Sequence, residues 1–215
     1  MGTHGKTRAR ESARKLRIDK QRRALKRAQI VKSIRKWDDP ILKQVTEPVE
    51  ENEISTGIAQ GWADEMIKTL KATKDGVGLA APQIGLSKSI LVYQTKDAGG
   101  KIVYEIMVNP LVVEYGKVQV TSREACLSYP GYEARVQRYD AIKVNWKSAT
   151  GKDKEGWLNG RDAIIFQHEN DHLSGICKVG EEWEKAVGLR PKDTDEITSD
   201  AFFEDVNVGA EIPAA

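Results

Sequence analysis

Cysteines are scarce in this sequence, and long apolar runs are absent. Only two cysteines, Cys126 and Cys177, occur among 215 residues, whereas small secreted scaffolds use several, in pairs. No stretch approaches the ~20 consecutive apolar residues of a membrane helix. The charged N-terminus lacks the apolar segment of a secretory signal, and Lys6 stands where N-myristoylation requires Ser or Thr. We therefore expect a cytoplasmic protein with no membrane partner, and import into an organelle stays open.

Charge is distributed unevenly, although the net charge is only +2. Residues 1–30 carry eleven Lys/Arg and two acids, and residues 181–215 carry ten acids and three Lys/Arg. We predict a basic N-terminal extension over 1–30, a catalytic domain over 31–183 and an acidic tail over 184–215. The helix-compatible basic arm is interpreted as a docking element for an anionic partner such as the ribosome or its RNA. A solubilising tail, or pairing with the acidic end, is the alternative.

Apolar periodicity predicts two main helices. One covers 55–71, with Ser55 or Thr56 as its N-cap, and the other covers 159–173 and is closed by Gly175. Glycines mark 76–85 as a loop, and the last thirty or so residues lack periodicity and are expected to be loose. Strands are predicted over 89–93, 105–108, 117–121, 134–136 and 141–146. Because no βαβ rhythm is present, we expect an α+β fold with mainly antiparallel sheets around a central metal-binding helix.

The main chemical signal is the segment QHENDH at residues 167–172. His168 and His172 are four residues apart, so on a helix they project from one face and can reach one ion. Glu169 lies beside them, where it would contact a water at the ion rather than the ion itself. This is the H-E-x-x-H arrangement of metallohydrolases. An exposed helix face with two ordinary histidines is the alternative, although the chain has only three histidines in all.

A catalytic metal site needs a third protein ligand and one open position. No histidine follows His172, whereas Cys126 stands upstream in the segment EACLS, between two predicted strands. Its thiolate would complete a three-ligand site. Taken alone, an isolated cysteine is more simply a small buried hydrophobe, and this is our interpretation of Cys177.

A third segment, GVGLAAPQ at residues 76–83, is rich in small residues. Glycine and alanine let a backbone approach a ligand closely, and Gln83 adds a side-chain amide that can donate a hydrogen bond. A GxG pair is weak evidence by itself. It does not match the dinucleotide-binding fingerprint, because no strand leads into it and the third glycine is absent.

In this order, the three segments resemble the motifs GxGLAAxQ, EGCLS and QHExDHLxG of the peptide deformylase family, and the likeness extends from about residue 30 to about residue 183. The resemblance implies an α+β fold and removal of the N-formyl group from the formyl-methionine of new polypeptides, with release of formate. One departure is Ala125, where the family usually has glycine. We expect this added Cβ to affect sequence preference rather than abolish activity.

The resemblance also implies a role for each site residue. It makes Cys126, His168 and His172 the ligands of one divalent ion, usually Fe(II), with Zn, Ni or Co as alternatives. It makes Glu169 the general base and acid. The remaining roles concern the substrate: Gln83 and the backbone N–H of Leu127 as oxyanion donors, Gly78 against the substrate backbone, and Val77 in the methionine pocket.

Two other functions compete with this interpretation. A general zincin-type endoprotease explains the helix motif but leaves Cys126 and the glycine-rich loop without a role. A ribosome- or nucleic-acid-binding protein with a structural zinc would need four protein ligands, and only three can be assigned. Asp171 and Arg138 are candidates for orienting the ligands, with surface charges as the alternative.

Overall fold

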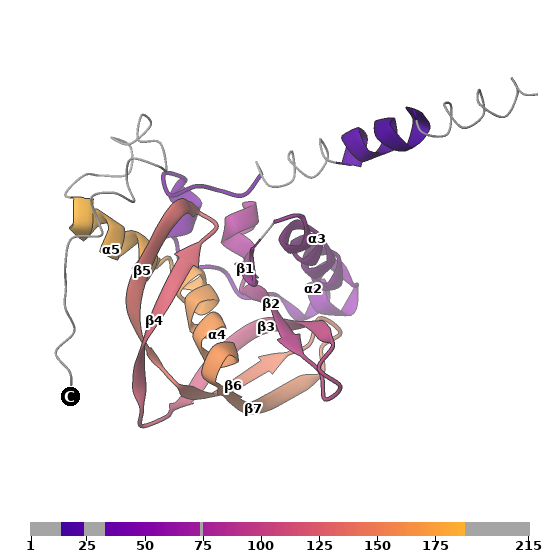
Figure 1. The fold of residues 1–215 in the computed structure, drawn as a ribbon. Helices are drawn as coiled ribbons and strands as arrows, with labels where there is room; N and C mark the ends of the chain where they lie inside the picture. Colours follow the sequence, from indigo (N-terminus) through magenta and orange to yellow (C-terminus); the bar gives the residue numbers. More distant parts are fainter. Residues whose placement is uncertain (1–13, 24–32, 74, 188–215) are drawn as a thin grey trace, which may run out of the picture.

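The computed structural model describes residues 14–23, 33–73 and 75–187. It combines helices with two antiparallel sheets, as predicted (Figure 1). One sheet has five strands in the order β1-β2-β3-β6-β7, and the other is the hairpin β4-β5. Their bounds are β1 Gly78–Ala80, β2 Ile90–Lys96, β3 Ile102–Tyr115, β4 Gln119–Cys126, β5 Tyr129–Tyr139, β6 Ala141–Lys147 and β7 Asp153–Asn159.

The helical segments are η1 Pro40–Lys43, α2 Glu51–Ser55, α3 Ile58–Ala72, η2 Ala81–Ile84, α4 Gly160–Leu173 and α5 Lys178–Val187. Residues 14–23 are also helical, and nearly all are exposed. In α3, Ala59, Ala63, Met66 and Leu70 recur every three or four residues and are buried, which is the face of an amphipathic helix. Among the described residues, no helix is long and apolar enough to cross a membrane.

The predicted start of the first main helix is wrong. Ser55 is the last residue of the short helix α2, and Thr56 caps the C-terminus of α2. Helix α3 begins only after Gly57, whose φ of 80° lies in the left-handed region. Glycine enters this region without steric cost, so the chain turns here and one predicted helix becomes two.

Three further elements differ from the sequence prediction. The predicted loop over 76–85 contains the short strand β1 and the 3-10 helix η2. Strand β7 was not predicted, because it lies at the edge of its sheet and its inward-facing positions are only half-buried. Helix α5 was not predicted; it packs against β5 and β4, and it extends to Val187, beyond residue 184, where the tail was predicted to begin.

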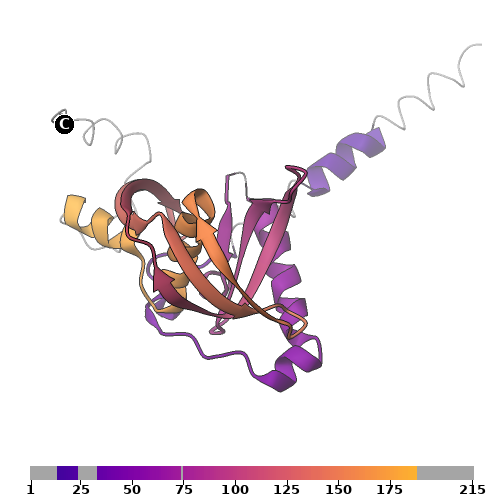
Figure 2. The ribbon, with the colours of Figure 1, turned by 90° about the horizontal axis from the view of Figure 1, so that it is seen from below.

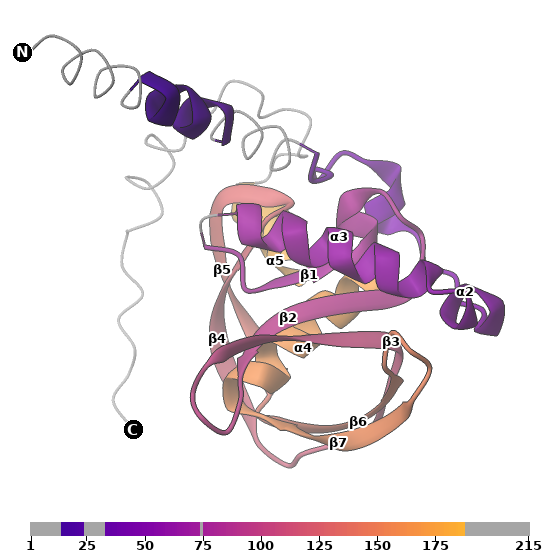
Figure 3. The same ribbon diagram turned by 90° about the vertical axis from the view of Figure 1, so that its right-hand side faces the viewer.

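Helix α4 runs between the two sheets (Figures 1 and 3). It contacts β1, β2, β6 and β7 of the larger sheet and β5 of the hairpin, while α3 covers the opposite face of β1 and β2 (Figure 2). The α4 residues Ala163 and Phe166 are fully buried against the larger sheet. Gly175, with a φ of 70°, follows the C-cap Ser174 and closes the helix as predicted. The side of α4 toward the hairpin is thereby left to carry polar chemistry.

Candidate active site

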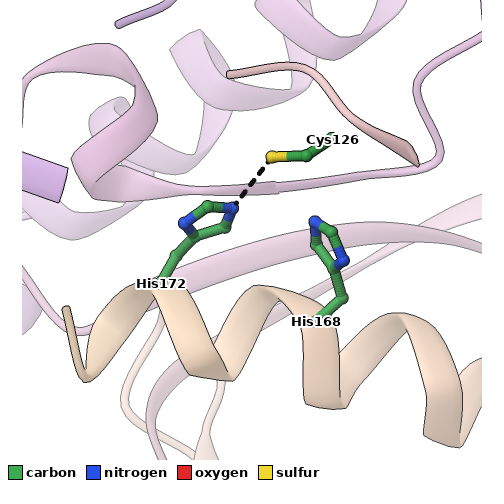
Figure 4. Close-up of side chains that lie close together, drawn as sticks. All are labelled: Cys126, His168 and His172. Carbon is green, nitrogen blue, oxygen red and sulfur yellow. Dashed lines mark hydrogen bonds between the residues drawn. The ribbon is translucent and has the colours of Figure 1, made fainter. Parts of the chain in front are cut away.

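Three predicted metal ligands meet where α4 faces the end of β4. His168 and His172 project from successive turns of α4 toward Cys126 (Figure 4). His172 Nε2 lies 3.3 Å from Cys126 Sγ, and ligand atoms from all three side chains lie within 4.8 Å of one another. Cys126 is 4% exposed and His172 is fully buried. Residues separated by more than forty positions in the sequence thus point at one small volume.

This donor set fits a divalent transition metal. A thiolate with two imidazoles suits zinc and iron, and three ligands leave a position open for chemistry. Burial lowers the pKa of His172 to about 3, so its ring is neutral, which is the form that binds a metal. His168 Nδ1 lies 2.9 Å from Glu124 Oε2. Because Glu124 is ionised, Nδ1 is the donor and Nε2 remains available for an ion.

A buried ion-pair network holds His168 from behind. Arg138 donates to both carboxylate oxygens of Glu124, at 2.8 and 2.9 Å, and to Asp171 Oδ2 at 2.6 Å. Burial opposes ionisation of Glu124, but the hydrogen bonds from Arg138 and His168 outweigh it and lower its pKa to about 2. Arg138 is only 2% exposed, so it is no surface charge. The network connects both ends of the histidine pair, because Asp171 precedes His172.

Glu124 was not assigned a role from the sequence. Its position contained the signal: Glu124 and Cys126 are two apart on β4, and alternate residues of a strand point to the same side. A carboxylate placed this way beside a candidate ligand is well placed to orient a histidine.

Glu169 extends from the same helix into the site. It is 4% exposed, and its Oε2 has no hydrogen-bond partner among the described residues. Burial raises its pKa to about 7, so the carboxyl group can both accept and release a proton near neutral pH. A Cβ added at Gly78 would collide with the Glu169 carboxylate. Glycine at position 78 therefore makes room for Glu169, a reason that sequence reasoning missed.

The side-chain amide of Gln83 has a fixed orientation. Its Oε1 accepts a hydrogen bond from the backbone N–H of Ala80 at 2.9 Å. This bond turns the NH₂ group inward, where Nε2 lies 3.2 Å from Ser128 Oγ and 3.8 Å from Cys126 Sγ. Gln83 is 1% exposed, so its two N–H groups are aimed at the candidate metal site rather than at solvent.

Lys36, which the sequence did not single out, braces the opposite side of the site. Its Nζ donates to the backbone carbonyl of Leu127 at 2.9 Å. The adjacent backbone also pairs, because Trp37 N donates to Ser128 O and Arg35 N donates to Gln83 O. The segment before η1 thus ties together the two segments that carry the predicted oxyanion donors.

A cleft of about 600 Å³ opens onto these groups. Val77, Gly78, Gln83, Leu127 and the other predicted site residues line it, apart from His172, which lies behind. Ala125 also lines it. Further lining residues, which sequence reasoning had not assigned, are Arg123, Tyr129, Arg161, Ile164 and Ile165. Cys177 packs against the apolar cluster around Cys126.

Comparisons with known proteins agree with this geometry. The family model described as "Polypeptide deformylase" matches residues 31–181. A peptide deformylase from Fusobacterium nucleatum is 38% identical over 150 residues, which cover 70% of this chain and 83% of that protein. The chloroplastic peptide deformylase 1B of Oryza sativa is 36% identical over 66% of this chain and 51% of its own length. A Met-Ala-Ser-bound peptide deformylase structure from Acinetobacter baumannii superimposes with a TM-score of 0.63, at 32% identity, over 69% of this chain and 96% of that one.

Proposed function

The chain belongs to the peptide deformylase family and removes the N-formyl group from new polypeptides, and from this premise we propose how its own residues carry out the reaction. The observation that carries the proposal is the convergence of Cys126, His168 and His172 within 4.8 Å, beside the buried carboxyl group of Glu169. These three residues hold one divalent cation. When bound, such a cation lowers the pKa of a coordinated water and polarises a carbonyl group.

Glu169 moves the proton. Its Oε2 has no partner among the described residues, so it can accept a proton from the water that attacks the formyl carbon. A pKa raised to about 7 by burial lets the same carboxyl group release that proton again. It passes the proton to the departing amine nitrogen, which leaves formate and a free N-terminus.

Gln83 and Leu127 stabilise the charge that develops on the formyl oxygen. Gln83 Nε2 already points inward, because Oε1 is held by Ala80. The backbone N–H of Leu127 is the second donor, and the Lys36 hydrogen bond to the Leu127 carbonyl keeps this segment in place. Donors fixed before the reaction need no reorganisation, and each is typically worth ~3–4 kcal/mol in the transition state.

The cleft supplies the binding energy for a short peptide. Val77, Ile164 and Ile165 line it with apolar surface that suits a methionine side chain. Gly78 lies beside Glu169, where it would contact the substrate backbone. The A. baumannii relative was crystallised with Met-Ala-Ser, and a peptide with an N-terminal methionine is the class of ligand proposed here.

Formate release tests the function directly. The protein is purified without oxygen, and its metal content is measured by elemental analysis. We expect about one ion per chain, Fe(II) in the cell, with zinc, nickel or cobalt after aerobic purification. Formate should be released from formyl-Met peptides, whereas an endoprotease would cleave an internal peptide bond. A protein that holds its ion and does neither would contradict the proposed function.

The basic N-terminal extension is proposed to dock the enzyme on the ribosome, in the cytoplasm. Eleven Lys/Arg lie in residues 1–30. In the described part of the arm, residues 14–23, nearly all side chains are exposed, so the Lys and Arg of this part are available to an anionic surface. Phosphate contacts release counterions, and binding should therefore fall steeply with salt.

A further inference from the structure

Arg161 lies at the outer end of the cleft, on the first turn of α4. It lines the cleft, and its side chain is 56% exposed. Its Nη1 donates to the backbone carbonyl of Gln94 on β2, at 2.9 Å. Gln94 in turn bonds the segment before β1, because its backbone N donates to Val77 O and its Nε2 donates to Gly76 O. The guanidinium is therefore held near the segment of the cleft wall that carries Val77.

Most donors of this guanidinium remain available. An arginine carries five N–H donors. Among the described residues, Arg161 uses one of them on Gln94 and makes a loose ion pair with Asp162 Oδ1 at 3.8 Å. Asp162 itself accepts a hydrogen bond from Thr95 Oγ1 at 2.5 Å. The other arginine at the cleft, Arg123, is ion-paired with Glu133 on β5.

The remaining charges of the cleft wall do not cancel Arg161. Glu124 is bound by Arg138 and His168 deep in the site, and Glu169 lies at the reacting end. Asp75 is the one other acid among the described lining residues. A cationic group with spare donors thus faces the path by which a substrate leaves the reacting centre.

Helix geometry gives the position of this charge along a bound peptide. Arg161 and His168 are seven residues apart, which places them on the same side of α4, about 10 Å apart along its axis. An extended peptide advances ~3.3 Å per residue, so this span corresponds to about three residues. Ile164 and Ile165 lie between, where the methionine side chain belongs.

We propose that Arg161 is a specificity-determining residue that favours substrates with an acidic side chain at position two or three. The formylated methionine is position one. This inference rests on the proposed function and adds a substrate class to it. Arg161 takes no part in the chemistry. Its charge acts on binding, so the preference appears in kcat/KM through KM, and it weakens as salt screens the pair.

The test compares three C-terminally amidated peptides, formyl-Met-Ala-Asp, formyl-Met-Ala-Asn and formyl-Met-Ala-Lys, with matched peptides that vary the second residue. We expect the wild-type enzyme to favour Asp over Asn about fivefold at low salt, the size of one partly exposed ion pair. Arg161→Gln should reduce the ratio to about one, Arg161→Lys should restore most of it, and Arg161→Glu should favour Lys instead. Free-acid peptides show separately whether a terminal carboxylate is recognised.

Arg123→Gln is the matched control, because it removes a cleft arginine that is already paired; it should leave the ratio unchanged. An Asp/Asn ratio that is equal in wild type and Arg161→Gln would overturn the proposal, as would a ratio that follows Arg123. Calorimetric binding of the deformylated amides, Met-Ala-Asp against Met-Ala-Asn, gives the same comparison without turnover. Absence of formate from every peptide would count against the proposed function. The ratio of affinities for Met-Ala-Asp and Met-Ala-Asn would still show whether Arg161 determines the preference.

Discussion

The two ends of the cleft-facing side of α4 are built on different principles. At the inner end, His172 is fully buried, and the buried Arg138 and Glu124 form a network that also includes Asp171, whose side chain is 17% exposed. At the outer end, the Arg161 side chain is 56% exposed and makes one hydrogen bond to the described residues. Charges are strongly coupled where water is excluded and weakly coupled where it is not. Single changes at the inner end should therefore weaken metal binding or catalysis, whereas changes at the outer end should only alter which substrates are preferred.

The largest effect is expected from Cys126→Ser. It removes the one thiolate among the three candidate ligands, so both bound metal and formate release should be lost. Cys177→Ser is the matched control, because it changes a neighbouring thiol that has no ligand role, and it should keep metal and turnover. Elemental analysis with an activity assay measures both. Full metal content and full turnover in Cys126→Ser would show that the ligand assignment is wrong.

The next largest effect is expected from Glu169→Ala. The carboxyl group acts on water and not on the ion, so this variant should bind metal normally while kcat falls by ~10²–10⁴-fold. Gly78→Ala tests Glu169 without replacing it. The added Cβ collides with the Glu169 carboxylate and should also lower kcat. Near-normal kcat in a metal-loaded Glu169→Ala variant would remove Glu169 from the mechanism.

Gln83→Leu should lower kcat by ~10²-fold, the cost of losing one oxyanion donor. KM should change less, because the hydrogen bond strengthens only in the transition state. Ser128→Ala is the control: it removes the group to which Gln83 Nε2 now donates and leaves the amide in place. Steady-state kinetics on one formyl-peptide separates the cases, and a change confined to KM would contradict the oxyanion role.

Arg138→Leu should weaken metal binding by ~10–100-fold, because Glu124 would no longer be held against His168. It should also lower the free energy of unfolding by ~3–5 kcal/mol, since Glu124 would become a buried charge without its main partner. Arg123→Leu, on the same hairpin, breaks an ion pair in which Arg123 is 76% exposed, and should cost less than ~1 kcal/mol. Equal losses of stability in the two variants would contradict the expectation that the buried Arg138 ion pairs contribute more than the exposed Arg123 ion pair.

The same contrast explains what the sequence could predict. The convergence of Cys126, His168 and His172 was predictable because histidines four apart share a helix face, and because three motifs occur in a known order. The α+β class and the closing Gly175 were predictable from periodicity and from glycine chemistry. The His168–Glu124–Arg138 network was not, because pairing between β4 and β5 decides which side chains meet. Strand β7 and helix α5 were missed because their burial comes from tertiary contacts that leave only a weak local pattern.

The smallest effect on chemistry is expected from deleting residues 1–30. If the arm only brings the enzyme to its substrate, kcat/KM on a short formyl-peptide should equal that of the full chain, because such a peptide diffuses to the cleft unaided. Co-sedimentation with ribosomes at low salt should drop sharply, and the remaining binding should depend less on salt, since fewer counterions are released. A matched full-length variant with the arm's Lys and Arg changed to Gln keeps the length and removes the charge; it should behave like the deletion. Equal co-sedimentation of all three proteins would reject docking, and loss of activity on the short peptide would show that the arm belongs to the catalytic domain.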